Sequence, residues 1–96
     1  METTQTPAFA KWFAGLRDLM AQRKIATRIA RVEAGLMGDV KSVGDGVSEL
    51  RVDYGPGYRL YFTMRGQQLI ILLVGGDKNS QQRDIEKAKE MAAQIP

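Results

Sequence analysis

The sequence contains neither cysteine nor histidine among its 96 residues. Without cysteine, no disulfide framework and no thiolate metal site can form, which disfavours a small secreted protein. Without histidine, the commonest general base and the commonest imidazole metal ligand are missing, so a histidine-dependent nuclease and a zinc enzyme are excluded. Asp, Glu, Lys, Arg and Tyr side chains must carry any chemistry, and we expect neither a metal nor another cofactor.

Long apolar runs are also missing. The longest, from Leu69 to Val74, is far too short to span a membrane. The N-terminal residues METTQTP lack the basic-then-apolar layout of a signal peptide. We therefore expect a cytoplasmic protein without a membrane partner. Its length predicts a single domain, residues 1–96, that buries a core with little area to spare.

The positive charge is moderate and unevenly distributed. The chain has 14 Lys and Arg residues against 11 Asp and Glu residues, a net charge of +3, which suits an acidic partner without requiring one. Five cations and one anion lie between Arg17 and Arg31, whereas cations and anions balance between Arg83 and Glu90. The segment from Arg17 to Arg31 is therefore basic, and the C-terminal segment is balanced.

Two helices are predicted near the N-terminus, after a short stretch that could add an edge strand. Thr6 supplies an N-cap and Pro7 suits the first helical position. A second helix is predicted from about Gln22 to Ala34, with Gly35 as its C-cap and Ile25, Ile29 and Val32 facing inward. The first helix carries an apolar stripe, so its aromatic residues are assigned to the core and not to base stacking. The stripe consists of Phe9, Trp12, Phe13, Leu16, Leu19 and Met20.

A basic stripe runs beside the apolar face of the second helix. It consists of Lys24, Arg28 and Arg31. This spacing fits an ordinary solvated helix face, and it also fits a surface that follows a phosphate backbone. We include these residues among the candidates for nucleic-acid binding.

The middle of the chain predicts a β-hairpin. A brief strand, Val40 to Val43, is followed from Val47 by alternation of apolar and polar residues. Gly55-Pro56-Gly57 is the expected reversal, and Tyr58, Leu60, Phe62 and Met64 are expected in the core. Pairing Tyr54 with Tyr58 would set Asp53 opposite Arg59, and Arg51 opposite Tyr61. These polar residues would then share one solvent-exposed face with Glu49, and we assign Glu49 and Asp53 to the surface that contacts nucleic acid.

The last third predicts a central strand and a helix. Leu69 to Val74 is continuously apolar, as in a strand that is covered on both faces. Gly75-Gly76 predicts a tight exit from that strand, which places Lys78 at the rim of the sheet. Asn79 or Ser80 could cap a final helix, with Ile85, Ala88, Ala92 and Ile95 facing inward. The fold class is therefore α+β: two N-terminal helices on a mainly antiparallel sheet of three or four strands, with a C-terminal helix.

These residues could support metal-independent RNA cleavage. The reaction requires activation of the 2′-hydroxyl, stabilisation of the charge on the phosphorane and protonation of the leaving oxygen. Arg51, Arg59 and Lys78 could stabilise that charge. The residue types leave the proton transfers open between Tyr61, Lys78 and the carboxylates Glu49 and Asp53. The alternative is a purely structural set, in which Asp53 and Arg59 form an ion pair and Tyr61 packs as a wall.

Four motifs extend over nearly the whole chain: F-x-x-W-F from Phe9, GDVKSVGDGVSELR from Gly38, YGPGYRLYF from Tyr54 and LLVGGDKNSQQRDI from Leu72. Through them the chain resembles the RelE/ParE toxin superfamily, and within it the short, phage-derived, HigB-like group of "addiction module killer proteins". The resemblance implies a RelE-like fold and the toxin of a type II toxin-antitoxin system. It also implies a helix-turn-helix antitoxin similar to HigA, through which alone the toxin would reach operator DNA.

The resemblance also implies an activity, namely cleavage of mRNA on the ribosome without a metal. Matched motif by motif, Arg51 takes the place of a strand lysine, Arg59 is the arginine of G-Y-R, and Lys78 is the basic residue beyond the last strand. Tyr61 completes our candidate catalytic set. Glu49 stands where the family has another cation, and the C-terminal helix has no tyrosine. Two alternatives therefore stay open: a ParE-like inhibitor of DNA gyrase, and a non-catalytic toxin that acts as a co-repressor with its antitoxin.

Overall fold

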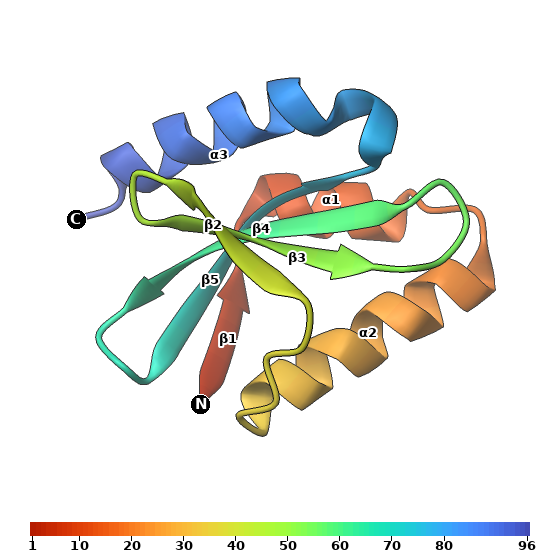
Figure 1. The fold of residues 1–96 in the computed structure, drawn as a ribbon, viewed down its shortest axis with the longest axis horizontal. Helices are drawn as coiled ribbons and strands as arrows, with labels where there is room; N and C mark the ends of the chain where they lie inside the picture. Colours follow the sequence, from red (N-terminus) through yellow and green to blue (C-terminus); the bar gives the residue numbers. More distant parts are fainter.

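The computed structural model describes residues 1–96, which form a five-stranded mixed sheet between two helical layers (Figure 1). The spatial order of the strands is β1-β5-β4-β3-β2. Helices α1 and α2 contribute to the core on one face of the sheet, and α3 packs on the other. The elements are β1 (Glu2–Gln5), α1 (Pro7–Ala14), α2 (Leu19–Glu33), β2 (Val40–Gly44), β3 (Val47–Val52), β4 (Tyr58–Arg65), β5 (Leu69–Gly76), the 3-10 turn η1 (Lys78–Ser80) and α3 (Gln81–Gln94).

The α+β class and the order of the elements agree with the sequence prediction, but three or four strands was an underestimate. The N-terminal strand β1 pairs in parallel with β5, which makes the sheet mixed and leaves β1 at its edge. The other strand pairs are antiparallel. None of the helices has the length and apolar character needed to cross a membrane.

Side-chain caps explain where the two N-terminal helices begin. The Thr6 hydroxyl accepts a hydrogen bond of 3.1 Å from the Phe9 amide, and Pro7 follows directly. The Asp18 carboxylate caps α2, which therefore begins at Leu19 and not at Gln22. Leu19 and Met20 consequently open the second helix and are exposed, so their assignment to the stripe of the first helix was wrong.

The predicted register of the hairpin was wrong by two residues. Val52 is opposite Tyr58, so Arg51 is opposite Arg59 and Glu49 is opposite Tyr61. The reason lies in the connecting loop, which begins at Asp53. The Tyr54 amide donates a hydrogen bond to the Val52 carbonyl, and the Gly57 amide donates one to the Tyr54 carbonyl. Tyr54 is therefore part of the turn and does not pair with β4. Asp53 is exposed as a result and forms no ion pair with Arg59.

The core has two layers separated by the sheet. Leu50, Leu60 and Phe62 pack toward α1 and α2, where they meet Phe9 and Ile25. Trp12 and Phe13 are half-buried against this layer, as the apolar stripe predicted. The second layer lies under α3 and contains Val47, Tyr61, Ile71, Leu73, Val74, Ala88 and Ala92. Met64, which was expected in the core, is 38% exposed near the end of β4.

Gly75 and Gly76 lie within β5 and do not form the tight exit that was predicted. A side chain at Gly75 would collide with the Trp12 indole, and one at Gly76 would collide with the Asp84 carboxylate. The two glycines therefore allow α1 and α3 to approach the same strand closely.

Candidate functional site

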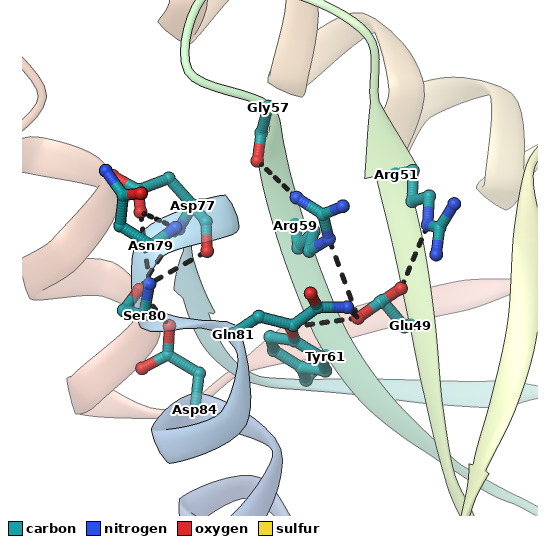
Figure 2. A network of polar contacts seen from close by, with 10 residues as sticks. All are labelled: Glu49, Arg51, Gly57, Arg59, Tyr61, Asp77, Asn79, Ser80, Gln81 and Asp84. Carbon is teal, nitrogen blue, oxygen red and sulfur yellow. Dashed lines mark hydrogen bonds and ion pairs between the residues drawn. The ribbon is translucent and has the colours of Figure 1, made fainter.

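The candidate site lies where the end of the β3–β4 hairpin approaches η1 and the start of α3 (Figure 2). Its centre is Glu49, whose side chain is fully buried. Three groups donate hydrogen bonds to this carboxylate: Arg51 Nε at 3.1 Å, the Tyr61 hydroxyl at 3.0 Å and Gln81 Nε2 at 2.9 Å. Arg59 Nε lies 3.7 Å from Glu49 Oε2. One carboxylate thus joins β3, β4 and α3.

Arg59 is held so that one side of its guanidinium stays free. Nη1 donates a hydrogen bond of 2.9 Å to the Gly57 carbonyl. Nε is buried next to Glu49 but is too far away for a hydrogen bond. Nη2 has no partner within the protein and is not buried, so it is available to an oxygen of a ligand.

Lys78 reaches the same region from another element. Its 3-10 turn is capped by the Asp77 carboxylate, which accepts hydrogen bonds from the amides of Asn79 (2.8 Å) and Ser80 (3.3 Å). A Cβ atom built on Gly57 would lie 3.3 Å from Arg59 Nη1 and 3.7 Å from Lys78 Cβ, which shows how close the loop, β4 and η1 are. Lys78 is exposed and forms no ion pair. Its ammonium group is therefore free for an anion.

The environment shifts the pKa of both acidic groups at the centre. Burial alone would raise the pKa of Glu49, but hydrogen bonds from Gln81, Arg51 and Tyr61, with the charge of Lys41, outweigh burial and lower it. Burial, together with the hydrogen bond to Glu49, raises the pKa of the Tyr61 phenol strongly. At neutral pH the pair therefore consists of an ionised carboxylate and a protonated phenol.

The structure brings together most of the predicted catalytic residues, but not on a solvent-exposed face. Arg51 and Arg59 are neighbours, and Lys78 is beside the Gly57 loop. Tyr61 and Glu49 are fully buried, because α3 crosses this face of the sheet. The expectation of a shared exposed face was wrong for these two residues and for Arg59, which is only 9% exposed.

The basic stripe of α2 lies along a groove apart from Glu49. Lys24, Arg28 and Arg31 line the groove together with Arg51 and Asp53. Asp53 therefore lies in this groove, near the basic stripe, and does not pair with Arg59. Arg51 alone belongs to both regions.

Sequence reasoning missed Gln81, which donates to Glu49, and the buried Asp84, which accepts a hydrogen bond of 2.5 Å from the Ser80 hydroxyl. A signal was present. Asp77 and Ser80 have the spacing of a capping box, which places Gln81 in the first turn of a helix directly after the last strand. No three acidic side chains come together anywhere in the chain, so the site offers no carboxylate set for a metal ion.

A family profile described as "Phage derived protein Gp49-like (DUF891)" matches residues 11–94. The chain belongs to this family. An uncharacterized protein of Haemophilus influenzae is 46% identical to the Gp49-like chain over 95 residues, which cover 99% of this chain and 94% of the relative. The matched region of the Gp49-like protein includes every residue of the site and of the α2 groove.

Proposed function

We propose that this Gp49-like protein is the toxin of a type II toxin-antitoxin system and acts as a metal-independent endoribonuclease on mRNA bound to the ribosome. One observation carries the proposal: β3, β4 and η1 bring Arg51, Arg59 and Lys78 around one end of the sheet, with Glu49 holding the two arginines. The resemblance of its motifs to the RelE/ParE superfamily supports the same function.

The three cations would hold the scissile phosphate. Arg59 Nη2 and the Lys78 ammonium have no partner in the protein, so they can bind phosphate oxygens without breaking an existing contact. Arg51 is half-exposed beside them and adds a second guanidinium. As charge builds up on the phosphorane, these preorganised cations stabilise it more than they stabilise the substrate.

Proton transfer contributes less in this site than charge stabilisation. Glu49 is a weak base because its pKa is lowered, and Tyr61 stays protonated because its pKa is raised. We assign Tyr61 and Gln81 to positioning, since both act by fixing Glu49. Lys78 is the exposed group that can donate a proton to the leaving oxygen, while the proton of the attacking 2′-hydroxyl passes to water.

The proposed partner is a small helix-turn-helix antitoxin, as the resemblance implies. A toxin with exposed phosphate-binding cations must be silenced until it is needed, so an antitoxin would cover the site or prevent entry into the ribosome. Helices α1 and α2 would contribute to its interface. Hydrogen exchange of the co-expressed complex tests this: protection limited to residues 49–63, with residues 9–34 unchanged, would contradict it.

Expression of the chain alone, followed by mapping of the 5′ ends of cellular mRNA, tests the activity. We expect cuts in register with codons, and we expect them to disappear with Arg59→Ala. Arg59 is buried, so its replacement could also weaken the fold. The exposed Lys78→Ala is therefore the second variant, and Lys87→Ala, at an exposed position of α3, is the charge-matched control. Growth arrest with intact mRNA would overturn the proposal.

A second candidate is inhibition of DNA gyrase. The observation in its favour is the burial of the Tyr61 hydroxyl, which leaves few exposed groups for proton transfer beside the cations. This candidate predicts that the purified protein blocks supercoiling by gyrase and leaves mRNA uncut. A supercoiling assay with the wild-type chain and Lys78→Ala distinguishes the two candidates. Inhibition of gyrase by the wild-type chain would favour the second candidate, and unimpaired supercoiling would favour the ribonuclease.

A further inference from the structure

A basic groove of about 490 Å³ lies between α2 and the exposed end of β3. Five cations line it against two anions, so its charge is strongly positive. The cations are Arg23, Lys24, Arg28, Arg31 and Arg51, and the anions are Asp39 and Asp53.

Two cations of the stripe, Lys24 and Arg28, are held by contacts with other parts of the protein. Lys24 Nζ lies 5.4 Å above the centre of the Tyr54 ring, whose hydroxyl donates a 2.8 Å hydrogen bond to Asp18 at the start of the helix. Arg28 Nη2 donates a 3.0 Å hydrogen bond to the Met37 carbonyl. The Arg28 guanidinium packs closely on Gly38: a Cβ atom built there would lie 2.7 Å from Arg28 Nη2, so a larger residue would displace the guanidinium. Lys24 and Arg28 are therefore positioned before any ligand binds, whereas the Arg31 side chain is exposed and makes no contact of this kind.

The groove is continuous with the site around Glu49. Strand β2 begins at Val40, which pairs with Leu50, and the Arg51 amide still donates a hydrogen bond to the Asp39 carbonyl, so this edge of β3 is open only from Val52 onward. A long side chain next to the open edge can reach both faces of the sheet. Arg51 does so, because it donates to Glu49 on the α3 side and also lines the groove on the α2 side.

We infer that the groove binds the phosphate backbone of the single-stranded RNA that flanks the phosphate held by Arg51, Arg59 and Lys78. The inference rests on the proposed function and adds the path of the substrate. Along α2, Lys24, Arg28 and Arg31 follow one another at about 6 and 4.5 Å of helical rise, which forms a row of cations along the groove that Arg51 also lines. A strand bound at the site would pass along this row.

An acidic segment of a protein is the competing occupant, because guanidinium groups bind carboxylates as readily as phosphates. The shared residue Arg51 favours RNA. It connects the groove to the cations of the site, so an extended polyanion gains contacts in both places.

The binding test uses an oligouridylate with 2′-O-methyl groups, which cannot be cleaved through attack by the 2′-hydroxyl. The groove variant is Arg23→Gln with Arg31→Gln, since both side chains are exposed and make no hydrogen bond or ion pair. The control is Lys11→Gln with Lys87→Gln, which removes the same charge from exposed positions outside the groove. Fluorescence anisotropy gives the dissociation constant at several salt concentrations.

We expect the groove variant to bind about ten-fold more weakly and to lower the slope of log K against log salt by about 1.4, the loss of two phosphate contacts with a single strand. The control should change the slope by much less. The dissociation constant of the wild-type protein should also fall as the oligouridylate is lengthened beyond a dinucleotide. The dissociation constant of the groove variant should change little over the same lengths.

Equal affinity and slope for the two double variants would overturn the groove proposal, even if mRNA is cut in cells. Loss of binding to a polyglutamate peptide, with RNA binding unchanged, would also overturn it and assign the groove to an acidic protein. Groove-dependent RNA binding without any mRNA cleavage in cells would instead refute the proposed function and leave the groove assignment standing.

Discussion

Arg51 and Arg59 are directly opposite each other on β3 and β4, and both approach the carboxylate of Glu49. Like charges at directly opposite positions of a strand pair repel each other. The buried carboxylate between them reduces that repulsion and fixes both guanidinium groups. One anion for two arginines leaves a net positive charge, which a phosphate can neutralise.

Glu49→Gln should destabilise the protein. The substitution removes the negative charge but keeps the shape, so Arg59 Nε would remain buried without its ionic partner. We expect a loss of about 1–3 kcal/mol in the free energy of unfolding, measured by urea denaturation. Glu90→Gln, at an exposed position of α3, is the control. Equal midpoints for the two variants would show that Glu49 does not hold the site together.

The contribution of Glu49 to stability should depend on pH in a defined direction. Its pKa is lowered in the folded protein from the ordinary value of 4.5, so the unfolded chain takes up the proton first as the pH falls. The stability difference between wild type and Glu49→Gln should be full at neutral pH. It should decrease as the pH falls below 4.5 and through the lowered pKa. Asp18, whose pKa is also lowered, is present in both proteins and cancels in the difference. A difference that grows on acidification would contradict the assignment.

Lys78→Ala and Arg51→Ala should separate activity from stability. Each should reduce RNA cleavage by about 10²-fold, because each removes one preorganised contact with the phosphate. Lys78 makes no contact that stabilises the fold, so its variant should unfold at the wild-type urea concentration, whereas Arg51→Ala should unfold slightly earlier because it loses the bond to Glu49. Cleavage at the wild-type rate by a destabilised Arg51→Ala protein would make Arg51 a structural residue.

Gly76→Ala should damage both the fold and the site. Its methyl group would overlap the Asp84 carboxylate and push the start of α3, which carries Gln81, away from Glu49. We expect a cost of about 1–3 kcal/mol, measured by thermal or urea unfolding. Gly15→Ala is the control, because Gly15 has a negative φ and its nearest contact would be at 3.3 Å. Equal stability of the two variants would mean that α3 can shift without loss.

The sequence by itself determined the elements and most of the core. The Thr6 cap, the alternation from Val47 and the apolar run from Leu69 depend on chemistry between residues close together in the chain. Each of these signals is therefore readable without knowledge of the fold. The sequence also predicted that Arg51, Arg59 and Lys78 lie in one basic region. Arg51 and Arg59 are on strands joined by a hairpin, and Lys78 follows the next strand at the same end of the sheet.

Only the tertiary structure decided the burial of the site and its pairings. The register of β3 and β4 depends on the hydrogen bonds within the loop from Asp53 to Gly57, and a shift of two residues changed the partner of Arg59 from Asp53 to Arg51. Glu49 and Tyr61 are buried because α3, distant in the sequence, covers their face of the sheet. Alternation of apolar and polar residues along a strand predicts that the two faces of the sheet differ in polarity. It does not predict that a helix distant in the sequence will cover the polar face. That contact depends on the free energy of the whole chain.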